Sequence, residues 1–146
     1  MRMSAVGETE MDAWEAPFKS VLGFLLQSSL LAARFGLGPE AESILAPVEA
    51  VRPRHVSSQL ARALVRIYGG SYQDAVDGLD SGLLQEDPNH DMARAIKALG
   101  LYHLGRFTEC RVLVKDLQEQ AAATPDSVSG QARDLIASLA VEIGSV

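Results

Sequence analysis

Residues 70–75 read GSYQDA and residues 105–110 read GRFTEC, and these two stretches decide the fold. Each follows one pattern: glycine, any residue, an aromatic residue, two further residues, a small residue. Residues 36–41, GLGPEA, keep the first glycine and the final small residue but have glycine in the aromatic place. The final small residues are 34 and 35 positions apart: Ala41, Ala75 and Cys110. So constant a period indicates a repeat architecture.

Other residues recur with the same period and describe one repeat. Twelve positions before each final small residue stands another small one: Ser29, Ala63 and Ala98. After it, Pro53 and Pro88 close the first two units, and Pro125 closes the third more loosely. We interpret each unit as two helices that are joined at the glycine, which supplies a positive φ, and that cross closely at the small residues. The proline then ends the second helix.

This interpretation predicts an all-α fold: a superhelix of α-α hairpins with about seven helices, the last of which caps the third hairpin. The helices are expected near residues 11–35, 39–51, 56–69, 72–86, 89–104, 107–123 and 127–143. The cap is expected to bury Ala132, Leu135, Ile136, Leu139, Val141 and Ile143. Residues 1–10 are expected to form a disordered acidic leader, followed by a single helical-repeat domain at residues 11–146.

Composition excludes several classes of protein. A chain of 146 residues can bury its own core, so neither a disulfide nor a structural metal is required. The one cysteine, Cys110, excludes a disulfide scaffold and favours a reducing compartment, the cytoplasm. The net charge of −6 argues against nucleic-acid binding, which normally requires a basic surface. The most apolar window, residues 21–35, is too short and too interrupted to span a membrane, and we interpret it as a buried helix.

The repeat resembles the tetratricopeptide repeat (TPR) over roughly residues 18–125. The matching residues are Gly70, Tyr72, Ala75 and Pro88, then Gly105, Phe107 and Cys110, then Ala41 and Pro53, with Gly38 in place of the aromatic residue. The first helices depart from the family pattern, because Gln59, Arg62 and Arg66 fall in its apolar places. A slip of one residue would turn apolar residues inward and leave the guanidinium groups in water, and we favour it. The inward residues would then be Leu60, Ala63, Leu64 and Ile67.

Within that family, the short acidic chain, its leucine-rich opening helix and the run at residues 41–53 resemble the small TPR proteins of bacterial type III secretion. These include the Hrp-type family and the chaperones of needle subunits. The resemblance implies an adaptor or chaperone that shields an amphipathic segment of a secretion partner, with a homodimer as one arrangement. Two alternatives remain: a self-assembling component of the secretion apparatus, and a general TPR scaffold that recognises an acidic C-terminal peptide.

Apolar residues on the first helices outnumber what one core-facing stripe requires. A helix that is apolar on all sides is either buried on both sides or has apolar surface left exposed, to which a partner can bind. In stacked hairpins the first helices line a concave groove, which could receive an amphipathic partner helix. The candidate groove residues are Leu26, Leu30, Leu60, Leu64, Tyr68, Leu99 and Tyr102. Neighbouring hairpins and the cap could instead bury this surface within the chain.

A second candidate is a basic ladder across two repeats. It consists of Arg62, Arg66, Arg94 and Lys97. A solvated face is the default interpretation of such a group. The ladder could also dock the carboxylates or the free C-terminus of a partner, because arginine binds a carboxylate through two parallel hydrogen bonds.

Other chemistries have little support in the sequence. We interpret the histidines as turn residues in water, since none has a second ligand at a metal-binding spacing: His55, His90 and His103. Cys110 fills a small-residue place, which favours packing over nucleophilic chemistry. The acidic run at residues 74–87 is interpreted as a solvated helix face. We therefore predict a protein-binding domain that is not an enzyme, with no catalytic residue, metal or cofactor.

Overall fold

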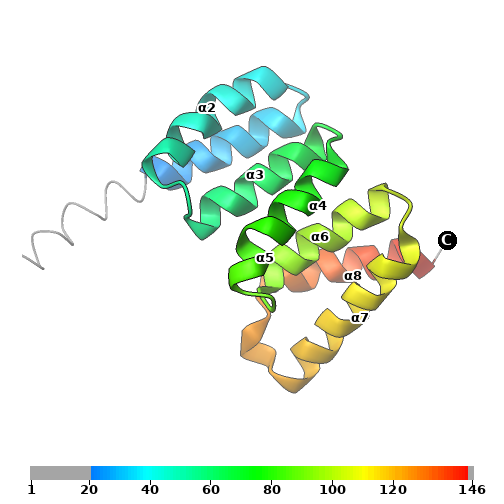
Figure 1. Cartoon of the computed structure of the whole chain (residues 1–146). Coiled ribbons are helices and arrows are strands. Elements are labelled where there is room, and N and C mark those ends of the chain that lie inside the picture. Colours follow the sequence, from blue (N-terminus) through cyan, green and yellow to red (C-terminus); the bar gives the residue numbers. More distant parts are fainter. Residues whose placement is uncertain (1–20, 145–146) are drawn as a thin grey trace, which may run out of the picture.

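The computed structural model describes residues 21–144, and every regular element in this range is a helix (Figure 1). A helix occupies residues 21–34. It is followed by α2 (Gly38–Val51), α3 (Val56–Tyr68), α4 (Tyr72–Ser81), α5 (Leu83–Glu86), α6 (Asp91–His103), α7 (Phe107–Ala123), the 3-10 helix η1 (Pro125–Ser127) and α8 (Gly130–Gly144). The predicted all-α fold is confirmed. The expected leader and the first part of the helix expected at residues 11–35 lie outside the described residues.

The helices form three hairpins in a row, and α8 closes the end of the row (Figure 1). The helix of residues 21–34 pairs with α2, α3 pairs with α4, and α6 pairs with α7. Consecutive hairpins are in contact, because α3 packs against α2, and α6 packs against α4. The last helix, α8, packs against both α6 and α7. We call this row of hairpins the stack.

Two predicted helices differ from the structure. The helix expected at residues 72–86 is interrupted at Gly82, whose φ of −112° and ψ of −104° are not helical, so it forms α4 and α5. The last helix, expected from residue 127, begins at Gly130, because residues 125–127 form η1 instead. The ends of the other predicted helices that fall within the described residues lie within two residues of expectation.

Each hairpin turns at a glycine, as the repeat predicts. The three residues with positive φ in the described part of the chain are Gly36, Gly70 and Gly105, with φ of 77°, 83° and 77°. At Gly70 the N–H groups of residues 70 and 71 donate to the carbonyls of Ile67 and Arg66, at 3.1 and 2.8 Å. The same pair of bonds occurs at the other two glycines. This Schellman arrangement satisfies the last carbonyls of the first helix.

The predicted small-residue pairs are where the helices of each hairpin cross. All six residues are buried: Ser29, Ala41, Ala63, Ala75, Ala98 and Cys110. In the first hairpin the Ser29 hydroxyl donates to the Ala41 carbonyl at 2.9 Å. In the third, the Cys110 thiol donates to the Ala98 carbonyl at 3.2 Å. The crossing point therefore keeps the same geometry while the side chain that bridges it changes.

Three apolar cores run along the stack, and α3 lies between two of them. Its residues Ala61 and Val65 belong to the first core, with Ala41 and Leu45 of α2. Its residues Ala63 and Ile67 belong to the second core, with α4 and α6. Leu60 and Leu64 pack against that second core and are half-buried. The apolar residues therefore turn inward as the favoured register predicts. Its second expectation, guanidinium groups in water, was wrong, because Arg62 and Arg66 are half-buried, as is Gln59.

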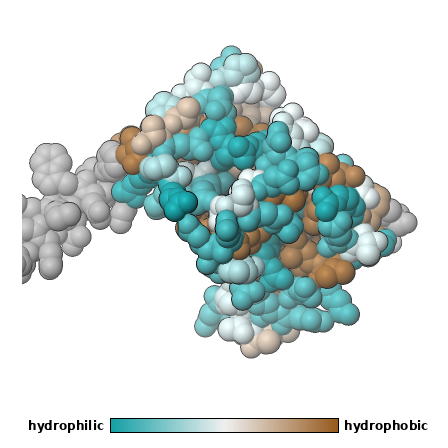
Figure 2. Space-filling model, viewed as in Figure 1, coloured by the Kyte–Doolittle hydropathy of each residue, from teal (hydrophilic) through white to brown (hydrophobic). Residues whose placement is uncertain are grey.

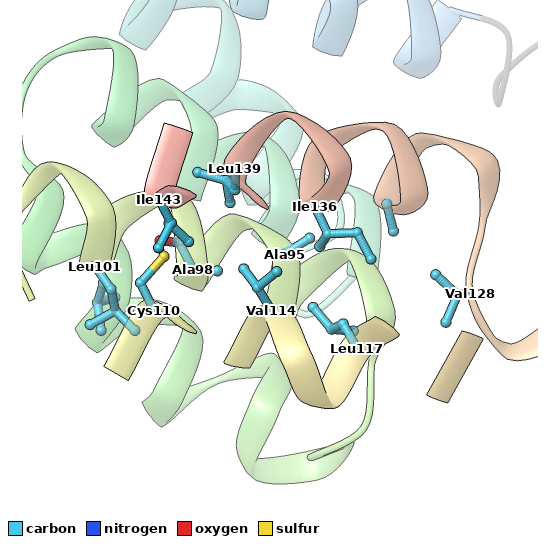
Figure 3. Packing of buried hydrophobic residues seen from close by; sticks show 12 residues of the cluster. Ala95, Ala98, Leu101, Cys110, Val114, Leu117, Val128, Ile136, Leu139 and Ile143 are labelled. Carbon is cyan, nitrogen blue, oxygen red and sulfur yellow. The ribbon is translucent and has the colours of Figure 1, made fainter. Parts of the chain in front are cut away.

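The cap α8 completes the third core, between α6 and α7 (Figure 3). Ile136, Leu139 and Ile143 of α8 are buried against Val114 and Leu117 of α7. Ala132 is buried too, and Leu135 is half-buried. The prediction for Val141 was wrong, since this side chain is 73% exposed. Val141 is two positions from both Leu139 and Ile143, and two positions on a helix correspond to opposite sides.

A hydrogen bond joins the residue just before the cap to α6. The N–H of Ser129 donates to the Asp91 carboxylate at 2.6 Å, although the two residues are 38 positions apart. Burial of Asp91 opposes its ionisation, but hydrogen bonds from the backbone of Ser129 and Met92 outweigh that effect and lower the pKa of Asp91. The first residue of α6 thus binds the residue that precedes α8.

Candidate partner-binding surface

The predicted groove residues, here called the inner apolar set, come from the first helices of the three hairpins. Six of the seven are half-buried, and Tyr68 is 45% exposed. Leu26 and Leu30 pack against the first core. Leu60 and Leu64 pack against the second core, which Leu99 shares with the third. The structure thus brings Leu60, Leu64 and Leu99 together and keeps the first two residues with a separate core.

The cap engages the C-terminal member of the set. The hydroxyl of Tyr102 lies 3.5 Å from the carboxylate of Glu142 on α8, to which it donates. Its ring packs edge-on against Phe107, with ring centres 5.6 Å apart. Leu135 of α8 packs against both the second and the third core. Tyr102 is therefore engaged within its own chain, and the most exposed member of the set is Tyr68 on α3.

A recess of about 240 Å³ adjoins the set at Leu26. It lies between the helix of residues 21–34 and the connection from α2 to α3, and it is lined by Leu22, Gly23, Leu26, Val48, Arg52, His55, Ser57 and Ser58. The apolar lining comes from the first hairpin, whereas α3 contributes the polar residues at its beginning. The inner apolar set therefore continues into a recess with one polar wall.

Two of the histidines are helix caps and not free turn residues. The Nδ1 atom of His55 accepts from the N–H of Ser57 at 3.2 Å, at the start of α3. The Nδ1 atom of His90 accepts from the N–H of Ala93 at 3.2 Å, at the start of α6. Each therefore satisfies one of the unpaired donors of a helix N-terminus. A recurring sequence signal, proline followed two positions later by histidine, precedes both helices.

The four cations of the predicted basic ladder lie against polar groups of neighbouring helices. The guanidinium of Arg62 pairs with Glu42 and Glu49 of α2. Hydrogen bonds from Glu49 and then Glu42 raise the pKa of Arg62, and its bond lowers the pKa of Glu42. The ammonium of Lys97 lies 2.9 Å from the carboxylate of Asp80 on α4.

The two other ladder cations also have partners in the chain. Arg94 donates to the side-chain oxygen of Gln120 on α7 at 2.8 Å and lies 3.8 Å from the Asp116 carboxylate. Arg66 lies 3.5 Å from the Asp74 carbonyl of α4 and donates to it. Arg62 and Lys97 are 35 positions apart, and each binds a carboxylate on the second helix of the preceding hairpin. Arg62 and Lys97 therefore join consecutive hairpins, whereas Arg66 and Arg94 join the two helices of their own hairpin.

One apolar surface was not predicted as exposed. On the helix of residues 21–34 and just after it, large apolar side chains face solvent; their exposed fractions are 56% for Val21, 68% for Phe24, 54% for Leu31 and 75% for Phe35. We call these four residues the end stripe. The interpretation of residues 21–35 as a buried helix is therefore wrong for one side, although Leu22, Ser29 and Ala33 are buried. Hydropathy identified the helix but could not show which of its sides another element of the described chain covers.

Figure 2 shows one face of the molecule. That face is largely hydrophilic, with a hydrophobic area over α7 and another where the described chain begins. The exposed apolar residues include Val112 on α7, which is 57% exposed, as well as the end stripe. Exposed apolar residues therefore include a group at the beginning of the described chain and Val112 on α7.

Chemistry-bearing groups are few in the described part of the chain. Burial raises the pKa of the Cys110 thiol, which keeps it protonated and poorly nucleophilic. No cluster of three or more histidine, cysteine or acidic side chains that could hold a metal occurs among residues 21–144. In the same range, no helix has the length and apolar character needed to cross a bilayer.

The comparisons with known proteins identify no relative. No family model, no curated protein and no solved structure matches the chain.

Proposed function

We propose that this protein is a helical-repeat adaptor that binds another protein and catalyses no reaction. The observation that carries the proposal is the inner apolar set, in which Tyr68 is 45% exposed beside the half-buried Leu60 and Leu64. These side chains share one side of α3, because they recur at intervals of four residues. An amphipathic partner helix presents a matching row at intervals of three and four residues.

The proposed mechanism is shielding. The partner's apolar side chains would lie on the inner apolar set and leave water, at roughly 25 cal/mol per Å² before the cost of ordering the partner. The recess beside Leu26 lengthens the available apolar surface toward α2. The resemblance to small TPR proteins of type III secretion supports a secretion subunit as the partner, held soluble in the cytoplasm before export.

The second candidate function is a self-assembling component of the secretion apparatus. The end stripe favours it, since four large apolar side chains there are more than half exposed. Recognition of an acidic C-terminal peptide is not proposed, because the ladder cations already pair with groups of their own chain.

Co-expression with small helical proteins encoded by neighbouring genes tests the adaptor function. We expect one of them to co-purify with the native chain, and we expect Tyr68→Asp to reduce its capture at least about tenfold. Because Tyr68 is 45% exposed, this variant is expected to fold. The matched control is Val112→Asp on α7, which is 57% exposed and should leave capture unchanged.

Circular dichroism of each variant measures whether the helices remain. Equal capture by the native chain and the folded Tyr68→Asp variant would contradict the inner apolar set as the binding surface. Loss of capture with Val112→Asp alone would move the site to α7.

A further inference from the structure

The end stripe occupies the side of the first hairpin to which no other described element is added. Val21, Phe24, Leu31 and Phe35 follow one another at intervals of three, seven and four residues, which places them on one side of a helix. The buried residues Leu22, Ser29 and Ala33 lie on the opposite side. The end stripe is therefore a separate surface from the first core.

The later repeats show what this side of a first helix does. Phe24 corresponds to Ser58 in α3 and Ala93 in α6, which are 2% and 0% exposed. Leu31 corresponds to Val65, which is 9% exposed, and to Gly100, where an added Cβ would lie 2.9 Å from Val76 of α4. In both later repeats the preceding hairpin covers these positions. The end stripe is thus an uncovered hairpin-stacking face.

The charge on this face differs from that of the later repeats. Arg62 and Lys97, which bind carboxylates on the preceding hairpin, correspond to Ser28. The Ser28 hydroxyl donates to the Phe24 carbonyl of its own helix at 2.9 Å, so it can be covered without losing its bond. Ser28 and the four stripe residues are therefore uncharged and suit a neutral apolar surface, with the exposed Arg34 at the edge of the stripe.

The opposite end of the stack does not offer such a surface. Around the exposed Val141, the outer side of α8 carries exposed polar and charged residues: Arg133, Asp134 and Ser138. Head-to-tail addition of one chain to another would bury these groups against the end stripe, at a cost in desolvation. Contact between the end stripes of two copies is therefore the better match. Such a contact uses the same surface on both copies, so it gives a closed pair and not a filament.

The spacing of the stripe is compatible with a twofold axis. Val21 lies seven residues before Ser28 and Phe35 seven after it, while Phe24 and Leu31 lie four before and three after. Two antiparallel copies crossing at Ser28 would place Val21 against Phe35, and Phe24 against Leu31. The small Ser28 at the crossing allows a close approach, as the small residues do within each hairpin.

We propose that the end stripe binds the end stripe of a second copy of this chain, in a twofold antiparallel pair centred on Ser28. Each copy contributes four large apolar side chains that are more than half exposed, and a group of such side chains on one side of a helix is typical of an interaction surface. The pair leaves the inner apolar set of each copy free, so this inference does not depend on the proposed adaptor function.

Sedimentation of the purified full chain over a range of concentrations tests the pair. We expect a dimer, and we expect the double variant Phe24→Gln and Leu31→Gln to raise the dissociation constant at least about a hundredfold, since each change acts twice in a symmetric interface. The control Val141→Gln, at the opposite end, should remain dimeric. A native chain that is monomeric throughout, or a double variant that still dimerises as tightly, would overturn the proposal.

Cross-linking tests the symmetry independently. With Cys110 replaced by alanine, a Ser28→Cys chain should be joined to itself by a short bis-maleimide, because residue 28 of one copy meets residue 28 of the other. Phe35→Cys alone should not join to itself, but its mixture with Val21→Cys should yield a joined pair. Efficient self-joining at residue 35 and none at residue 28 would exclude this geometry.

Discussion

At the C-terminal end of the stack, α8 covers the third hairpin and buries Ile136, Leu139 and Ile143, whereas at the other end Phe24 and Leu31 face solvent. The two ends have the same turn glycine and the same small-residue crossing. They differ in whether a further helix of the described chain covers the last hairpin. The comparison teaches that the repeat specifies each hairpin, while what covers the two ends is specified separately.

The largest expected effect compares a core residue at one end of the stack with an exposed residue at the other end. Leu117→Ala removes a fully buried side chain from the third core and should lower the free energy of unfolding by about 2–5 kcal/mol, through lost burial and the cavity left behind. Leu31→Ala in the end stripe, measured at a concentration where the chain is monomeric, should change it by less than about 0.5 kcal/mol. Urea unfolding measures both, and similar losses would contradict the contrast between the ends.

The next largest expected effect tests the turn glycine that the first and third hairpins have in common. Gly105 and Gly36 both have φ of 77°, which costs other residues about 1–2 kcal/mol, so Gly105→Ala and Gly36→Ala should destabilise the fold by similar amounts. Gly130→Ala is the control, since an added Cβ there would have no neighbour within 4 Å. Thermal unfolding followed by circular dichroism compares the three. A much smaller loss at Gly36 would show that the first turn is not equivalent to the third.

The smallest effect isolates the attachment of the cap. Asp91→Asn should cost about 1 kcal/mol near neutral pH, by weakening the bond from the Ser129 N–H. The pKa of Asp91 is lowered by folding, so its contribution is complete above the ordinary aspartate pKa, near 4, and is lost as the pH falls through the lowered value. The difference between native and variant chains should therefore vanish in strong acid.

Unfolding measured at several pH values between 7 and 2 follows this difference. The control Asp126→Asn changes an exposed aspartate close to the same connection. A difference that persists unchanged at the lowest pH would mean that the charge of Asp91 does not hold the cap.

Local signals made much of the fold predictable. Gly70 and Gly105 set the turns, and Pro53 and Pro88 follow the ends of second helices; each acts on residues close to it in sequence. The small pairs, such as Ala98 and Cys110, were predictable because the twelve positions between them are spanned by one hairpin. Periodicity alone left the register of α3 open, since this helix is buried on two sides and has no single apolar face.

The candidate surfaces depended on contacts that the sequence does not display. Glu42 and Glu49 lie 20 and 13 positions from Arg62, and nothing at these spacings identifies them as its partners. The cap roles of His55 and His90 required the positions of backbone donors at the start of each helix. Likewise, the exposure of Phe24 depends on whether another element packs against that side of the first hairpin, which its own sequence does not show.

The short reach of the turns has a consequence for how the chain folds. Each glycine turn joins helices that are adjacent in sequence, and even the contact from Tyr102 to Glu142, across the cap, spans 40 residues. Proteins dominated by such local contacts fold quickly, because little loop entropy is lost before a contact forms. The first hairpin and α3 can therefore assemble on the ribosome before the codons for α8 are read.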